Sequence, residues 1–161
     1  MTATREEIDK VAMLVKNSKI ALLTTTTASG QLVSRPLAVQ KAEFDGDLWF
    51  LSQDPSDKTS EIAANNQVNV AMESGKGFLS IAGTASVLHD RTKIDELWSP
   101  MVEAWFPNGK EDDSVAVIKV TADAAEYWSA DEPKPVTLLK IAAATVTGKR
   151  PDIGGNETVT L

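Results

Sequence analysis

The 161-residue sequence contains no cysteine and a single histidine, His89. The absence of cysteine excludes disulfide bonds, thiolate metal sites and a cysteine nucleophile. No Gly-x-Ser-x-Gly turn, Walker loop or His-Glu-x-x-His motif occurs, so hydrolase triads and zinc hydrolysis have no support. His89 stands beside Asp90 and Arg91 at the end of an expected strand, where a surface or capping role is the favoured interpretation.

Long hydrophobic runs and an excess of basic residues are also missing. No segment approaches the roughly 18 apolar residues of a membrane span, and the opening MTATREEIDK has no apolar core typical of a signal peptide. The formal net charge of -7 argues against a surface for nucleic acid, whose phosphates require a clustered basic patch. We therefore expect a cytoplasmic protein with no membrane or nucleic-acid partner, and any bound anion to be small and locally coordinated.

The remaining composition suits one compact core. Hydrophobic residues make up 42% of the chain, which predicts a single domain over 1–161 with a loosely packed tail at about 148–161. Helical spacing of apolar residues predicts a helix over 5–17, and either Asp54 or Ser56 is suited to cap a short helix that ends near 65. A third helix is expected from Arg91, restarting at Ser99 and Pro100.

Residues that favour strands fill the segments between these helices. Strands are predicted at 20–27, 32–44, 47–53, 67–73, 77–89, 114–128 and 136–148. The turn at Asp45-Gly46 suggests that the third strand is antiparallel to the second. Five to seven strands joined mostly by tight turns predict a mainly β (α+β) fold, an antiparallel barrel with peripheral helices. A doubly wound α/β sheet is the alternative that the pattern supports less.

Two cationic residues mark a candidate anion site. Arg35 shares a strand face with aliphatic residues, so its guanidinium either pairs with an internal carboxylate, reaches solvent or faces a bound anion. Lys58 is followed by Thr59 and Ser60 near the start of the short helix, where free backbone N–H groups attract anions. Ordinary helix capping explains the polar residues of this segment equally well.

Several short motifs, in this order, resemble the pyridoxamine 5'-phosphate oxidase-like, FMN-binding split-barrel superfamily, and within it the general stress protein branch. The motifs are VSRPL at 33–37, WFLS at 49–52 with Lys58-Thr59, SIAGTA at 80–85, AWFP at 104–107, EYW at 126–128, and a tail with GKRP at 148–151 and GNET at 155–158.

The resemblance implies a homodimer of split barrels with FMN at the subunit interface. It implies that Arg35 and Lys58, with Thr59 beside them, hold the phosphate, and that Trp105 and Trp128 form aromatic walls, the latter from the partner chain. The ribityl chain and the isoalloxazine would be lined by backbone near Pro36 and Leu37, together with Phe50, Leu51 and Ser52.

Two departures bear on function. The true oxidases have a second basic residue before the lysine, where this sequence has Asp57, and an Arg-Leu-His motif after the tryptophan, where this chain reads SADEPKPV. Oxidation of pyridoxamine phosphate is therefore not expected. Three hypotheses remain: an FMN-dependent oxidoreductase of unassigned substrate, a non-catalytic flavin-storing stress protein, and a split barrel that has lost its cofactor.

Overall fold

The computed structural model describes residues 3–129 and 136–138, and all structural statements below concern those residues. The helices lie close to the predicted positions: α1 (Arg5–Asn17), α2 (Asp57–Ala64), α3 (Arg91–Leu97) and α4 (Pro100–Glu103). The strands are β1 (Ile20–Thr26), β2 (Leu32–Ala38), β3 (Asp47–Gln53), β4 (Gln67–Glu73), β5 (Gly77–Leu88), β6 (Val115–Ser129) and β7 (Val136–Leu138). The predicted tail at 148–161 and most of the last predicted strand lie outside the described residues.

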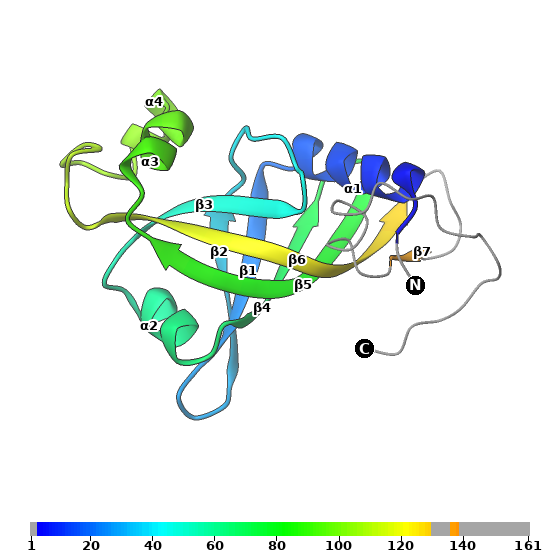
Figure 1. Cartoon of the computed structure of the whole chain (residues 1–161), viewed down its shortest axis with the longest axis horizontal. Helices are drawn as coiled ribbons and strands as arrows, with labels where there is room; N and C mark the ends of the chain where they lie inside the picture. Colours follow the sequence, from blue (N-terminus) through cyan, green and yellow to red (C-terminus); the bar gives the residue numbers. More distant parts are fainter. Residues whose placement is uncertain (1–2, 130–135, 139–161) are drawn as a thin grey trace.

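The strands form one antiparallel, strongly curved sheet in the order β2-β1-β4-β5-β6-β3, with β7 beside β6 (Figure 1). This confirms the predicted antiparallel barrel class. One prediction is wrong: β3 pairs with β6, from Asp47↔Thr121 to Gln53↔Val115, and not with β2. The two ends of the described sheet are therefore β2 and β3, and each has a backbone edge with no strand partner in the described part of the chain.

Gly83 permits the close approach of the two longest strands, β5 and β6, which pair along their length. The register of β5 against β6 shifts at Ala82/Gly83, and a Cβ at Gly83 would collide with the carbonyl oxygen of Thr121. A bulge of this kind increases the local twist of a sheet. The curvature that gives the sheet an inner and an outer face therefore depends on a glycine at this position.

The main hydrophobic core fills the inside of the curved sheet. Helix α1 lies across one opening of the curved sheet (Figure 1) and covers the core with Val11, Leu14 and Val15. Its first turn is closed by a capping box between Thr4 and Glu7. The box satisfies two backbone N–H groups that would otherwise lack acceptors. The predicted amphipathic helix over 5–17 is confirmed.

Strand β3 lies between two cores, as its apolar run suggests. Leu48 and Phe50 belong to the main core, whereas Leu51 belongs to a second cluster under α3 and α4. Trp49 packs against that second cluster, and the ammonium groups of Lys93 and Lys119 lie 4.3 Å and 5.3 Å from its ring centre. With both faces covered, the strand places the start of the segment that leads into α2 firmly.

Candidate anion site at the start of helix α2

Arg35 lies on the inner side of β2, half-buried, and contacts both β1 and α2. Its Nη1 donates to Glu61 Oε2 at 2.8 Å and to Thr25 Oγ1 at 3.0 Å, and its Nη2 donates to Glu61 Oε1 at 3.2 Å. The Thr25 hydroxyl in turn donates to Glu61 Oε2 at 2.7 Å. Of the alternatives left open by the sequence, pairing with an internal carboxylate is therefore what the structure shows for Arg35.

Lys58 lies in the first turn of α2 close to Arg35. Burial lowers the pKa of the Lys58 ammonium below its ordinary value of 10.5, and the positive charge of Arg35 lowers this pKa further. Neither a hydrogen bond nor an ion pair joins the Lys58 ammonium to any residue in 3–129 or 136–138, and because Lys58 is only partly buried this nitrogen reaches solvent. A half-buried cation without a carboxylate of its own, beside a second cation, is an electrostatic arrangement that favours a bound anion.

The N-terminus of α2 is fixed by Ser56 and Thr59. The Ser56 hydroxyl accepts from Thr59 N at 3.3 Å, and the Thr59 hydroxyl accepts from Ser56 N at 2.9 Å, which forms a capping box. Ser56, not Asp54, is therefore the cap. Thr59 is 3% exposed and its hydroxyl also donates to Ser56 O at 3.0 Å, so the structure uses this predicted ligand residue to cap the helix.

His89 and Asp54 connect the end of β5 to the end of β3. His89 Nε2 lies 2.7 Å from Asp54 Oδ2, and this contact lowers the pKa of the Asp54 carboxyl below its usual range. The His89 side chain is 51% exposed. This agrees with a surface role for His89.

The other predicted residues of β2 and β3 point mostly into the chain's own core. Phe50 and Leu51 are buried in the two hydrophobic clusters, and the buried Ser52 hydroxyl donates to Gln53 O at 3.0 Å. Leu37 packs against the main core, whereas Pro36 is exposed on the opposite face. Any contact of these residues with a ligand would therefore involve mainly the free backbone edges of β2 and β3.

The two predicted aromatic walls lie away from Arg35 and Lys58. Trp105 is 75% exposed in the turn after α4, on the side of the second core cluster. Trp128 is 38% exposed and pairs with Phe78 at the far end of β5, next to Glu73 at the end of β4. Strand β4 begins just after α2 and leads to Glu73, beside Trp128. Because a strand rises about 3.3 Å per residue, the six steps from Gln67 to Glu73 place Trp128 roughly 20 Å along the sheet from the C-terminal end of α2.

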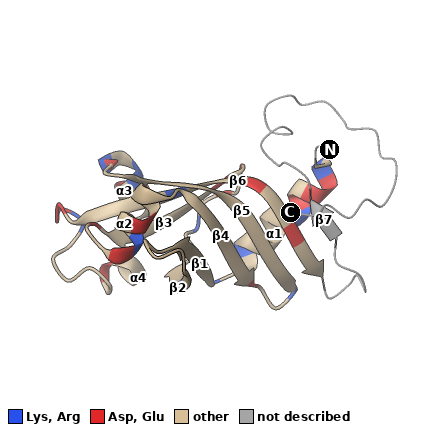
Figure 2. Cartoon of the chain, turned by 90° about the horizontal axis from the view of Figure 1, so that it is seen from below, with Lys and Arg blue, Asp and Glu red and all other residues tan. Residues whose placement is uncertain are grey.

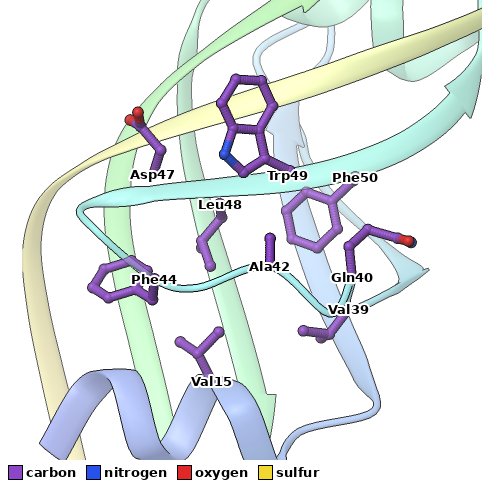
Figure 3. Close-up of a pocket in the computed structure, with 9 residues that line it drawn as sticks. All are labelled: Val15, Val39, Gln40, Ala42, Phe44, Asp47, Leu48, Trp49 and Phe50. Carbon is purple, nitrogen blue, oxygen red and sulfur yellow. The ribbon is translucent and has the colours of Figure 1, made fainter. Parts of the chain in front are cut away.

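A shallow hollow lies between α1, the segment that follows β2, and β3 (Figure 3). Val15, Phe44, Leu48 and Phe50 converge on it, whereas Trp49 points to the other side of β3. Its volume is about 10 Å³, roughly the room that one water molecule needs and far below the roughly 300–1,000 Å³ of ordinary ligand pockets. Of the predicted ligand residues only Phe50 lines it, so this hollow is not the predicted cofactor site.

The outer face of the sheet is a broad surface with few charged residues. Successive outward residues of β2, β1, β4, β5 and β6 face one another across the strands, and we call this surface the outer face. It comprises Ile20, Leu22, Thr24, Leu32, Ser34, Pro36, Ala38, Asn69, Ala71, Glu73, Phe78, Ser80, Ala82, Ala124, Glu126 and Trp128. Figure 2 shows β4 and β5 almost entirely tan, in contrast to the charged α2. Its large apolar members are exposed, Leu32 by 74% and Phe78 by 59%.

Two residues of the site escaped the sequence interpretation, Glu61 and Thr25. A partial signal existed for each. Glu61 follows Lys58 by three residues on a helix, which places both on one side, and Thr25 lies diagonally across the predicted hairpin from Arg35. The sequence suggested an internal carboxylate for Arg35 without showing which one.

The fold thus defined is a split barrel, and known structures share it. A general stress protein 26-related protein from Clostridium acetobutylicum has 22% identity over 83% of this chain and 94% of its own, with a TM-score of 0.71. General stress protein 26 from Bacillus anthracis has 21% identity over 83% of this chain and 99% of its own, with a TM-score of 0.70.

Sequence comparison then places the chain in a family. The model of the family described as pyridoxamine 5'-phosphate oxidase like matches residues 6–152, and the chain belongs to this family. Protein bli-3 of Neurospora crassa is 28% identical over 89% of this chain and 75% of its own length. A Xanthomonas citri structure, described as a general stress FMN/FAD binding protein, has 25% identity over 86% of this chain and 98% of its own, with a TM-score of 0.69.

The predicted family and fold are thereby confirmed. As for membranes, no helix in the described ranges is long and apolar enough to span a bilayer.

Proposed function

We propose that this chain binds FMN and holds the FMN phosphate with Arg35, Lys58 and the N-terminus of α2. The observation that carries the proposal is the half-buried Lys58 side chain, whose ammonium has no directly bound carboxylate in the described chain and lies beside a second cation. Family membership and the Xanthomonas citri FMN/FAD binding protein supply independent support.

The donors present suit a phosphate. Arg35 uses only Nη1 and Nη2 for Glu61 and Thr25, so Nε–H and the adjacent Nη2 N–H form a second fork for two anion oxygens. The Lys58 ammonium adds a point charge, and the first turn of α2 has N–H groups with no acceptor inside the helix. A phosphate here would neutralise the positive charge that Glu61 alone leaves unbalanced.

We further propose that the working unit is a homodimer formed through the outer face. This broad face carries only the charges of Glu73 and Glu126 and several exposed apolar side chains, and large exposed apolar patches mark interaction surfaces. Trp128 stands on this face roughly 20 Å from the α2 end, too far to share a phosphate site with Lys58 within one chain. A second copy would let Trp128 of one chain approach the flavin ring held by the other.

The proposed activity is that of a flavin-dependent oxidoreductase of a small substrate. Bound FMN would supply hydride and electron transfer, while the chain orients the cofactor and excludes water from it. The absence of an Arg-Leu-His motif after Trp128 in the sequence argues against pyridoxamine phosphate as the substrate. The same feature favours a second candidate, a flavin-storing protein without turnover.

A flavin titration tests the binding proposal. Purified protein is titrated with FMN, following the quenching of flavin fluorescence, for wild type, Arg35→Ala and Lys58→Ala. Each variant loses one charge-assisted contact, worth about 1.5–3 kcal/mol, so FMN affinity should fall about tenfold or more. Lys16→Ala, which removes an exposed charge at the end of α1, is the matched control and should bind like wild type.

Wild-type affinity in both site variants would show that the phosphate lies elsewhere. Size measurement with Leu22→Asp and Phe78→Asp tests the dimer, because a buried carboxylate in the proposed interface should give monomers. Oxidation of NAD(P)H faster than that by free FMN would favour the oxidoreductase, and its absence with tight FMN binding would favour storage.

A further inference from the structure

Helix α2 and strand β2 each contribute one cation to the proposed site, and Glu61 is the residue that joins these two elements. It lies on α2 three residues after Lys58, and its carboxylate binds the Arg35 guanidinium of β2 through both oxygens. The Glu61 side chain is 13% exposed and that of Arg35 is 26% exposed. The ion pair is therefore shielded from solvent and sets the spacing between the two positively charged groups.

Thr25 closes this arrangement from β1. Its hydroxyl accepts from Arg35 Nη1 at 3.0 Å and donates to Glu61 Oε2 at 2.7 Å, and the residue is 1% exposed. Three side chains from three elements therefore form a closed ring of hydrogen bonds. Such a ring restricts the rotation of the guanidinium about its long side chain.

Two carboxylates, Glu61 and Asp57, act on the two cations of the site. Arg35 and Lys58 repel each other, as the lowering of the Lys58 pKa by Arg35 indicates. Glu61 offsets the charge of Arg35 through their ion pair, whereas Asp57 is the carboxylate whose charge acts favourably on Lys58, at longer range. Arg35 in turn lowers the pKa of the Glu61 carboxyl, so Glu61 remains charged at neutral pH.

We propose that Glu61 is a positioning residue that keeps Arg35 and Lys58 assembled for the phosphate of the flavin. Glu61 occupies the Nη1/Nη2 edge of Arg35 and leaves Nε without a partner in the described chain, so it orients the guanidinium without blocking it. The alternative, a carboxylate that competes with the phosphate for Arg35, predicts the opposite effect of neutralising Glu61. This inference rests on the proposed FMN site.

The test compares FMN with riboflavin, which lacks the phosphate. Glu61→Gln should weaken FMN binding about tenfold and leave riboflavin binding unchanged, because only the phosphate contacts depend on the oriented guanidinium. A residue with a merely structural role would change both affinities alike. Glu6→Gln, which removes an exposed negative charge from α1, is the control for net charge.

A double-mutant cycle then locates the effect. If Glu61 acts through Arg35, Glu61→Gln should have no further effect on FMN affinity in an Arg35→Ala background. Thr25→Val should give a smaller loss in FMN affinity, and Thr25→Ser should restore it. These Thr25 variants also test the inference if Glu61→Gln does not fold.

Each outcome separates this inference from the proposed function. Equal or tighter FMN binding by Glu61→Gln, together with weaker binding by Arg35→Ala, would overturn the positioning role and leave the FMN site intact. Failure of wild type to bind FMN would overturn both.

Discussion

Two groups of charged residues in this protein contain the same kinds of side chain but differ in the balance between positive and negative charges. The α2 cluster consists of Arg35, Lys58 and Glu61, and the α3 cluster consists of Arg91, Lys110, Asp95 and Asp113. In the α3 cluster each cation has its own carboxylate, at 3.0 Å in both pairs. In the α2 cluster Glu61 binds Arg35 alone, Lys58 has no directly bound carboxylate in the described chain, and Asp57 acts on both cations only at longer range.

The two lysines show the consequence. Asp95 raises the pKa of Lys110, whereas burial and the charge of Arg35 lower the pKa of Lys58. The α3 cluster is also more exposed, with Arg91 at 45% and Asp113 fully accessible. Exposed, balanced pairs contribute little to either stability or binding. In the half-buried α2 cluster, positive charge exceeds negative charge, and this excess favours binding of an anion. The comparison therefore identifies the α3 cluster as a surface network and the α2 cluster as a candidate binding site.

The largest contrast is expected between Lys58→Met and Lys110→Met. Lys58→Met should lower FMN affinity about tenfold or more through loss of a charge-assisted contact. It should also preserve or raise the thermal unfolding midpoint without flavin, because folding disfavours this buried charge. Lys110→Met should leave FMN affinity unchanged and not raise the midpoint. Fluorescence titration and thermal unfolding measure both effects, and a loss of stability in Lys58→Met would contradict the comparison.

Arginine geometry provides the next contrast. Arg35→Lys retains the charge but loses the fork that serves Glu61 on one edge and the proposed phosphate on the other, so FMN affinity and stability should both decrease. Arg91→Lys, at the exposed cluster, should change neither measurably. Equal behaviour of the two variants in flavin titration and thermal unfolding would show that the Arg35 fork has no special role.

The next largest expected effect is a dependence of FMN binding on pH that is due to Lys58. The pKa of Lys58 in the free protein lies below 10.5, so its charge is lost at a lower pH than that of an ordinary lysine. The preference for FMN over riboflavin should therefore decline as pH rises toward 10, and Lys58→Met should show a flatter profile. Riboflavin corrects for titration of the flavin ring itself. A flat wild-type profile would remove Lys58 from the phosphate contact.

The smallest effect concerns acid stability. Arg35 and Thr25 hold the pKa of Glu61 below its ordinary 4.5, so its ion pair stabilises the folded state above that pH. This contribution is lost as pH falls through the lowered pKa of the folded state. Urea unfolding should show Glu61→Gln less stable than wild type at pH 7, and the difference should shrink below about pH 4. Asp113→Asn should show no such difference at either pH.

Local signals allowed the sequence to predict most elements. Thr4 with Glu7 marks the start of α1, and Ser99 before Pro100 marks the restart at α4. These features depend on neighbouring residues, so a linear pattern contains them. The pairing partner of β3, in contrast, does not depend on neighbouring residues. The turn at Asp45-Gly46 is compatible with pairing to β2, but β3 pairs with β6, some 70 residues later.

The site was predictable to a similar extent. Family motifs indicated Arg35 and Lys58, and the structure brings them together at the start of α2. Thr59 was predicted as a ligand residue, yet its hydroxyl completes a capping box. For Glu61 the sequence contained only a partial signal, its position three residues after Lys58, because its pairing with Arg35 depends on how α2 packs on β1 and β2. The assignments of Trp105 and Trp128 to the flavin stay predictions.

The most direct measurement is the ratio of riboflavin to FMN dissociation constants in wild type and in the Arg35→Ala/Lys58→Ala double variant. With two charged donors on the phosphate, wild type should prefer FMN about a hundredfold or more, and the double variant should bind both flavins alike. An undiminished preference for FMN in the double variant would contradict the assignment of the phosphate to these two residues.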